Sequence, residues 1–325
     1  MRRRKFIALA GGAASWPLFA AAQPGQTRRV GVLMSTIATD SDEAANIASF
    51  VAALGKAGWR ASSNLVIDYR WGAGDPHLFQ KYARELVDLN PDVLFAKGAA
   101  VPAIAAATSA IPVVFAVLSD QVAEKYVGNF ARPIGNLTGF TSNEIALVGK
   151  RIEILKELAP RIVRVLYLRG ARPETLPLFQ RAREGASALG LRITDGASSN
   201  LADLEHTIAT FSREDEGGIM SAFDAFNVVH RNQIIELAGQ YRLPAIFHAR
   251  SFVAAGGLAS YGFNTSEQYA QAAAYVDRIL RGEKPSGLPT QQPTRFELAI
   301  NLRTANALGL SLPTNLLTTA DEVIE

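Results

Sequence analysis

The sequence contains no cysteine, and this absence excludes several kinds of chemistry. Disulfide bonds, thiolate nucleophiles, metal–thiolate sites and lipidated cysteine anchors all require a cysteine side chain. Histidine is scarce as well, because the chain has only four. These histidines show no metal-ligand spacing and belong to no recognisable catalytic motif; they are His77, His206, His230 and His248. We therefore expect neither a metal site nor a bound cofactor.

The motifs of the common nucleotide-binding and hydrolytic enzymes are also missing. There is no P-loop, no Gly-x-Ser-x-Gly turn and no dinucleotide fingerprint after the first predicted strand. A hydrolase with a dispersed active site stays open as an alternative, because fold class alone does not fix function. We expect a protein that binds without catalysis, and we assign no catalytic residues.

Net charge is small once the first 22 residues are set aside. Those residues hold Arg2, Arg3, Arg4 and Lys5 but no acid, so without them the formal net charge changes from +3 to −1. A nearly neutral protein has no general electrostatic attraction for nucleic acid or for an anionic membrane. We therefore expect no nucleic-acid partner.

The same 22 residues have the pattern of an export signal, with basic residues, an apolar region and a run of alanines. The apolar region is too short and too interrupted, by Gly11, Gly12 and Pro17, to be a membrane span. Residues 3–7, Arg-Arg-Lys-Phe-Ile, resemble a twin-arginine signal without its preceding Ser or Thr, so both export routes stay open. We expect cleavage after Ala22 and a protein that is free in the periplasm.

Short apolar runs alternate with amphipathic helical patterns along the rest of the chain, which at 325 residues is long enough for two domains. This alternation predicts an α/β fold with parallel sheets that are covered on both faces. In such sheets ligands bind at the carboxyl ends of the strands. The predicted strands are residues 29–34, 65–69, 92–96, 111–118, 163–168, 192–195, 218–221, 244–247, 258–261 and 294–300.

Residues 131–140 carry no helical period and divide the chain into two similar halves. Pro133 fixes one backbone angle, whereas Gly135 and Gly139 permit angles that other residues avoid. These features predict a hinge between two lobes, although an ordinary loop between a helix and a strand has the same composition.

Several stretches together resemble one known family, and the similarity runs from residue 29 to residue 325. The matching stretches are 30–34 (VGVLM), 67–71 (IDYRW), 131–140 (ARPIGNLTGF), 155–160 (LKELAP), 241–246 (YRLPAI), 255–258 (AGGL), 260–262 (SYG), 275–280 (YVDRIL) and 292–294 (QPT). They are similar to the exported substrate-binding components of ABC importers that have a type I periplasmic-binding fold. Characterised relatives in that family bind tryptophan and phenylalanine.

The resemblance implies two Rossmann-like lobes with parallel central sheets, joined by three crossovers. Lobe 1 would contain residues 28–139 and 262–290, and lobe 2 residues 140–261 and 291–325. The lobes would close on a small ligand, and the closed monomer would dock transiently on an ABC permease in the inner membrane. A sensor subunit that signals to a membrane kinase would use the same clamp and is the alternative.

Three turns depart from the family pattern, and the departures put the relatives' ligand in doubt. A small polar residue followed by Gly-Thr-Pro is replaced here by residues 97–100, Lys-Gly-Ala-Ala, which lose a hydroxyl and gain a cation. The usual Asp-Pro is Asp120-Gln121, and the usual Pro-Asp is Phe263-Asn264. The expected solute is an amino acid, aromatic or not, or a related carboxylate; a purely acidic solute anchored by Lys97 is the rival.

Charged candidates for the ligand site follow two of the predicted strands. Asp224 would pair with a ligand ammonium group, because a desolvated cation needs a fixed opposite charge, and its alternative role is a helix cap. Lys97 would bind a carboxylate, and its alternative role is a solvated surface lysine. Asp120 follows the fourth strand, while His248 and Arg250 follow a later strand and are expected at the rim.

Neutral candidates complete the predicted ligand site. Hydroxyl groups of Ser35, Ser119 and Thr141, with backbone N–H groups of Gly98, Ala99 and Ala100, would hold a carboxylate near helix N-termini. Each hydroxyl could equally be a helix cap. Phe140 and Tyr261 would stack on a flat or apolar ligand, and packing at the hinge is their alternative role.

Overall fold

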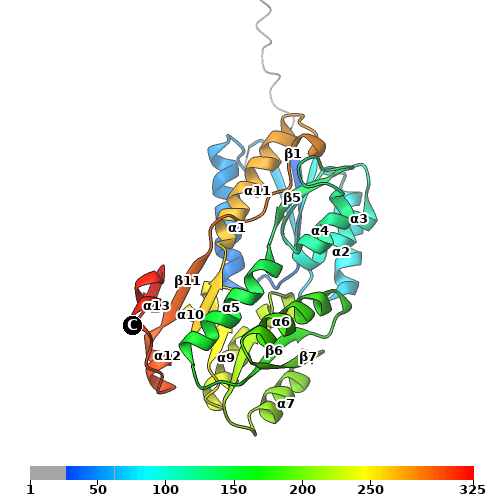
Figure 1. The fold of residues 1–325 in the computed structure, drawn as a ribbon. Helices are drawn as coiled ribbons and strands as arrows, with labels where there is room; N and C mark the ends of the chain where they lie inside the picture. Colours follow the sequence, from blue (N-terminus) through cyan, green and yellow to red (C-terminus); the bar gives the residue numbers. More distant parts are fainter. Residues whose placement is uncertain (1–26, 62) are drawn as a thin grey trace, which may run out of the picture.

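Short apolar runs form the central strands of two separate sheets, one in each lobe of the molecule (Figure 1). The computed structural model describes residues 27–61 and 63–325. The predicted leader, residues 1–22, lies outside the described part of the chain. Within that part, no helix is both long enough and apolar enough to span a bilayer.

The sheet of the first lobe has five parallel strands in the order β2-β1-β3-β4-β5. Every residue of β3 and β4 is buried, because helices cover both faces of the sheet. The strands are β1 (Arg28–Met34), β2 (Leu65–Trp71), β3 (Val93–Lys97), β4 (Val113–Leu118) and β5 (Leu137–Thr141).

Helices α1 and α11 pack side by side on one face of this sheet, and α2, α3 and α4 cover the other face (Figure 1). The helix α11 comes from a distant part of the sequence, yet it supplies core residues such as Tyr269 and Val276. The helices are α1 (Ser41–Lys56), α2 (Pro76–Asp88), α3 (Val101–Ala107), α4 (Asp120–Val127) and α11 (Thr265–Leu280), with short 3-10 turns at Gly98–Ala100 and Pro285–Gly287.

The sheet of the second lobe has seven strands in the order β12-β11-β10-β9-β8-β6-β7. All neighbours run parallel except β10 and β11, which are antiparallel. The strands are β6 (Arg164–Gly170), β7 (Arg192–Ser198), β8 (Gly217–Ser221), β9 (Ala245–Phe247), β10 (Ala259–Gly262), β11 (Glu297–Asn301) and β12 (Glu322–Ile324).

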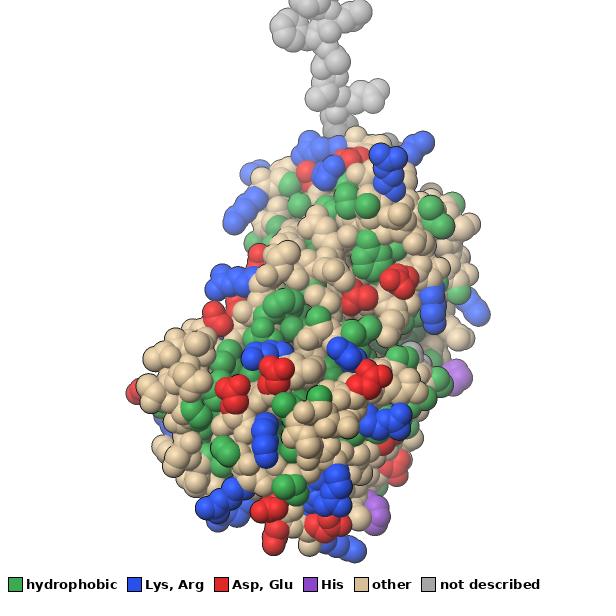
Figure 2. Space-filling model, in the orientation of Figure 1, with side chains coloured by type: hydrophobic (Ala, Val, Ile, Leu, Met, Phe, Trp, Pro, Cys, Tyr) green, Lys and Arg blue, Asp and Glu red, His purple; other side chains and the backbone are tan. Residues whose placement is uncertain are grey.

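Helices α5 and α6 cover one face of the second sheet, and α7, α9 and α10 cover the other. The helices of this lobe are α5 (Glu144–Leu158), α6 (Leu176–Ala188), α7 (Leu201–Phe211), α8 (Ala225–Val229), α9 (Arg231–Gln240), α10 (Arg250–Ala254), α12 (Leu302–Ala307) and α13 (Thr314–Thr319), with a 3-10 turn at Pro173–Thr175. Acidic and basic side chains are interspersed over both lobes on the face that Figure 2 shows.

The chain passes between the two sheets three times, after β5, after β10 and before β11. The predicted fold class is therefore confirmed: two α/β lobes with largely parallel sheets and three crossovers. The antiparallel β11 is the departure from a purely parallel second sheet.

The stretch predicted as the hinge leads into the first crossover between the lobes. Its second half belongs to β5, whose five residues are all buried at the edge of the first sheet. A Cβ atom on Gly139 would lie 2.0 Å from the backbone oxygen of Phe115, so glycine is needed here for the close approach of the two strands. The chain leaves the lobe only after Thr141.

Candidate functional site

A cavity of about 360 Å³ lies between the two lobes, at the carboxyl ends of strands from both sheets. This is the edge where parallel α/β sheets collect ligands. The first lobe contributes Ser35, Thr36, Lys97, Gly98, Ala99, Pro102, Val117, Leu118, Ser119, Val122, Lys125 and Tyr126. The second lobe and the crossover before it contribute Ser142, Glu144, Gly170, Arg172, Thr175, Leu178, Phe223, Asp224, Ala225, Phe226 and Val228.

Six of the predicted site residues line this cavity because they follow β1, β3, β4 and β8 directly. They are Ser35, Lys97, Gly98, Ala99, Ser119 and Asp224. Gly98 has φ +48, and a Cβ atom there would lie 3.3 Å from the backbone oxygen of Val117, so the turn after β3 packs against the end of β4.

Two of the remaining predicted residues are packed inside the first lobe and do not line the cavity. Ala100 is fully buried in the core formed with α2 and α3. Phe140 is 2% exposed, and its ring lies 4.8 Å from that of Tyr275, centroid to centroid. Phe140 therefore has the packing role that was the alternative to ligand stacking.

The other three predicted residues lie near the crossovers. The Thr141 hydroxyl donates to Asp120 Oδ1 at 2.7 Å, and Gln292 Nε2 donates to the same oxygen at 2.8 Å. Tyr261 packs beside Phe296, with ring centroids 6.1 Å apart. None of Asp120, Thr141 and Tyr261 is among the residues that line the cavity.

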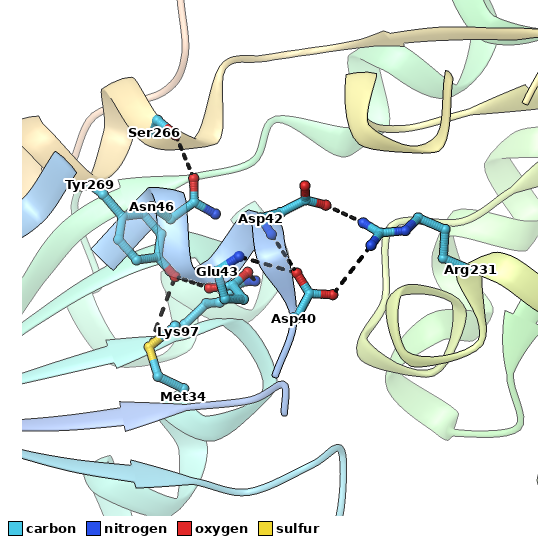
Figure 3. Close-up of polar contacts among 9 residues, drawn as sticks. All are labelled: Met34, Asp40, Asp42, Glu43, Asn46, Lys97, Arg231, Ser266 and Tyr269. Atoms are coloured by element: carbon cyan, nitrogen blue, oxygen red, sulfur yellow. Dashed lines mark hydrogen bonds and ion pairs between the residues drawn. The ribbon is translucent and has the colours of Figure 1, made fainter. Parts of the chain in front are cut away.

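Lys97 is not the solvated surface lysine of its alternative role, and its binding of a ligand carboxylate stays a prediction. Its side chain is buried and forms an ion pair with Glu43 of α1. Glu43 also accepts a hydrogen bond of 2.9 Å from the Tyr269 hydroxyl, which comes from α11 (Figure 3). Because Glu43 neutralises the ammonium group, Lys97 contributes little net charge to the cavity.

Asp224 has its predicted role as a helix cap, and its pairing with a ligand ammonium group stays a prediction. It caps α8, since Oδ1 accepts a hydrogen bond of 2.8 Å from the backbone N–H of Asn227. Its Oδ2 accepts a second bond of 2.8 Å from the backbone N–H of Gly170. Burial raises the pKa of Asp224 to about 6, although these N–H groups and the Arg172 guanidinium favour the charged form. The carboxylate also faces the cavity.

Three further charged residues of the cavity were not predicted from the sequence: Lys125, which is exposed, Glu144 and Arg172. Glu144 forms a buried bidentate ion pair with Arg151, with distances of 2.6 and 3.1 Å. Arg151 stands among the buried apolar residues of α5, and a charge in such a position was the signal that the sequence offered. Arg172 follows β6 and donates to the backbone oxygen of Gly74 in the opposite lobe. No local sequence pattern predicted a role for Arg172, because its hydrogen-bond partner comes from a distant part of the chain.

Much of the remaining cavity wall is apolar and aromatic, including Tyr126, Phe223 and Phe226. Val117 has a left-handed backbone with φ 59, which is rare for a β-branched residue. It lies where the β4–β5 register shifts, so a bulge in β4 shapes this wall. The cavity can therefore enclose an apolar group beside polar anchors.

A second set of contacts joins the lobes at the N-terminus of α1 (Figure 3). Asp40 caps α1 by accepting from the backbone N–H groups of Asp42 and Glu43, at 2.9 and 3.1 Å. Arg231 of α9 forms an ion pair with Asp42 and lies 3.8 Å from the Asp40 carboxylate. We call these three side chains, Asp40, Asp42 and Arg231, the inter-lobe clasp.

His248 is buried and does not reach the rim, contrary to the prediction. Its ring lies between those of Phe223 and Phe252, at centroid distances of 4.6 and 4.9 Å. Neither ring nitrogen has a hydrogen-bond partner of good geometry. Burial lowers the pKa of His248 well below its usual value, and the cations Arg151, Lys97 and Arg231 add to this; the backbone at Ala222 acts in the opposite direction.

The described residues offer no metal site, because they contain no group of three or more His, Asp or Glu side chains arranged to hold an ion. The chemistry of the cavity is that of hydrogen bonds, charge pairing and apolar contact.

A family model described as ABC transporter substrate binding protein matches residues 30–324. A protein from Clostridioides difficile (strain R20291), named a tyrosine-binding protein, is 23% identical over 272 residues, which cover 80% of this chain and 75% of that protein.

Solved structures share the fold. A conserved domain protein from Vibrio cholerae is 27% identical and covers 92% of this chain and 100% of its own, with a TM-score of 0.83. A domain from Streptococcus pneumonia in complex with L-Trp is 20% identical, with the same coverages and a TM-score of 0.84.

Proposed function

The chain belongs to the ABC transporter substrate-binding protein family, and from this premise we propose that it captures a small organic solute and passes it to an ABC importer. Proteins of this family bind small molecules for transport and are not enzymes. Proteins of this kind typically work in the periplasm or elsewhere outside the cytoplasm, and we place this one in the periplasm. The docking partner is then a permease in the inner membrane.

The solute that the cavity fits best is an amino acid with an aromatic side chain, or a related carboxylate. The single observation that carries this assignment is a cavity of about 360 Å³ in which the Asp224 carboxylate stands beside an apolar, partly aromatic wall. A carboxylate with a raised pKa in a sheltered site is stabilised when an ammonium group pairs with it. Relatives named for tyrosine and bound to L-Trp support the same class.

Two alternatives are less well supported. A purely acidic solute anchored by Lys97 would have to displace Glu43 from a buried ion pair, and breaking such a pair is costly. A sensor subunit would use the same cavity but would be encoded beside a membrane kinase, whereas an importer subunit would be encoded beside permease and ATPase genes.

A thermal-shift screen of the purified protein tests the solute class. We expect L-tyrosine, L-tryptophan or L-phenylalanine to raise the melting temperature, since a ligand at 100 times its Kd adds about 2.7 kcal/mol to the free energy of unfolding. The Asp224→Asn variant should lose most of this shift, and Asp203→Asn, on the exposed first turn of α7, should keep it. Stabilisation by simple carboxylic acids but by no amino acid would contradict the assignment of Asp224.

A further inference from the structure

A second cavity of about 380 Å³ adjoins the first one at the boundary between the lobes. The two cavities share four lining residues: Gly170, Arg172, Ala225 and Phe226. Arg172 is the only charged residue among the four, so its side chain stands at the partition between the two spaces. A solute in the first cavity and solvent entering from the second would both meet the Arg172 guanidinium.

The contact that Arg172 makes across the cleft depends on a specifically shaped loop. Between β2 and α2, Ala73 and Gly74 both have left-handed backbones, with φ 48 and 75. The backbone N–H of Gly74 donates to the Ser35 oxygen at 2.7 Å, which fixes the loop to the end of β1. The carbonyl oxygen of Gly74 then accepts from Arg172 Nη2 of the second lobe. Arg172 therefore touches the first lobe only when the cleft is closed.

The buried cations Lys97 and Arg151 already have carboxylate partners, whereas Arg172 is half-buried and the lining residue Lys125 is exposed to solvent. Lys97 pairs with Glu43, and Arg151 pairs with Glu144. Among the described side chains, no carboxylate lies within ion-pair distance of Arg172. A guanidinium has five N–H donors in a planar fork that matches a carboxylate, and the bond to Gly74 uses one of them.

We propose that Arg172 binds the carboxylate group of the solute while it also holds the Gly74 carbonyl oxygen, so that recognition of the solute and closure of the cleft depend on one side chain. This inference rests on the proposed function and specifies the anion anchor of the same site. It replaces Lys97 in that role. With Asp224 beside it, Arg172 gives the cavity one fixed negative and one fixed positive group.

This pair of charges selects a zwitterion. The ammonium group would face Asp224, the carboxylate would face Arg172, and the side chain would lie against the apolar wall near Phe223. A solute that lacks the carboxylate would leave Arg172 without its second partner in a partly desolvated site. Such a loss is severe, because a site built to bind a charged group rejects analogues that lack it.

Isothermal titration calorimetry with L-tyrosine and L-tyrosinamide tests the proposal, because the two probes differ only in the carboxylate. The variants are Arg172→Gln, the charge-retaining Arg172→Lys, and the control Arg132→Gln, whose side chain is exposed in the loop before β5. The wild type and the control should prefer L-tyrosine by at least about tenfold. Arg172→Gln should lose at least about tenfold in affinity for L-tyrosine and bind both probes about equally. Arg172→Lys should be intermediate, since it keeps the charge but not the fork.

Two results would overturn the proposal. The first concerns the Arg172 site alone, and the second also concerns the proposed solute class. If Arg172→Gln keeps the wild-type preference for L-tyrosine over its amide, another group holds the carboxylate, and the transport function stands. If the wild type binds neither L-tyrosine, nor L-tryptophan, nor 3-phenylpropanoate, both the solute class and the Arg172 site are wrong.

Discussion

At the scale of single residues, burial changes what a charged side chain can do in this protein. Lys97 stands at the end of β3, where a lysine would be available to a solute if it were solvated. Instead it is enclosed with Glu43, and each charge serves as the partner of the other. A buried ion pair contributes little net stability as a unit, but the loss of one partner leaves an uncompensated charge in the interior.

We therefore expect Lys97→Met to lower the free energy of unfolding by about 3 kcal/mol. The double variant Glu43→Gln with Lys97→Met should recover part of this loss, because no charge is then left unpaired. Urea denaturation followed by circular dichroism measures both. The matched control is Lys150→Met, which removes an exposed ion pair with Glu153 and should change the free energy of unfolding by less than about 0.5 kcal/mol. Equal effects of the two single variants would contradict the argument.

His248 makes the stability depend on pH. The pKa of its imidazole is lower in the folded protein than the usual 6.5, so between the two values the unfolded chain binds more protons. The free energy of unfolding therefore falls as the pH is lowered below about 6.5, by up to about 1.4 kcal/mol per pH unit.

The variant His248→Gln should show a weaker loss of stability than the wild type between pH 7 and pH 5, as measured by urea denaturation at each pH. Asp224 acts in the opposite direction, because its pKa is about 6 in the folded state, above its ordinary value of 3.8, so its contribution grows as the pH falls below about 6. That contribution is common to both proteins and cancels in their difference. Parallel pH profiles would show that His248 is not the group responsible.

Only some residues of the cavity could be predicted from the sequence, because the others depend on contacts between distant parts of the chain. Ser35, Ser119 and Asp224 were found because each follows a strand, and strand ends of a parallel sheet meet at one edge. The pairing of Lys97 with Glu43 and the reach of Arg172 to Gly74 depend on which elements become neighbours. No local pattern in the sequence contains that information.

At the scale of elements, the long periodic segments were predicted, whereas several short helices were not. The sixteen-residue helix α11 has a clear apolar face, and its start and end agree with its pattern within one or two residues. The helices α4, α10 and α13 have eight residues or fewer, too few for a helical period to stand out. The helical segment from Ala225 to Gln240 is interrupted at His230, which separates α8 from α9.

The role of Gly139 in β5 can be tested by substitution. Gly139→Ala would drive a Cβ atom into the backbone of Phe115, so we expect it to destabilise the protein by more than about 3 kcal/mol. The matched control is Gly135→Ala in the preceding turn, where φ is +78 but no atom lies within 4 Å. Only backbone strain applies at Gly135, so Gly135→Ala should lower the free energy of unfolding by about 1 kcal/mol. Urea denaturation measures the free energy of unfolding of both variants. Similar losses in the two variants would favour the hinge interpretation of residues 131–140.

At the scale of the whole molecule, two kinds of contact hold the lobes together. Three crossovers connect them covalently on one side, and the inter-lobe clasp and the Arg172–Gly74 hydrogen bond connect them across the cleft. The covalent connections are permanent, whereas the others can form only in the closed arrangement. Removal of the polar contacts should therefore shift the population toward open forms without unfolding either lobe.

We expect Arg231→Gln, which removes the cation of the clasp, to increase the radius of gyration measured by small-angle X-ray scattering. Its affinity for an amino-acid solute should fall by roughly tenfold, which corresponds to about 1.4 kcal/mol of lost closure energy. The control Arg278→Gln removes an exposed ion pair with Glu283 inside the first lobe and should change neither quantity. An unchanged radius of gyration for Arg231→Gln would show that the clasp does not govern closure.

The interleaved path of the chain has a consequence for its synthesis. The interior of the first lobe is incomplete until α11, which ends at Leu280, has emerged, and the sheet of the second lobe still lacks β11 and β12 at that point. Most of the polypeptide must therefore be synthesised before the interior of the first lobe is complete. Until then part of the apolar surface of the first lobe stays uncovered, and exposed apolar surface of this kind makes a newly made chain prone to aggregate.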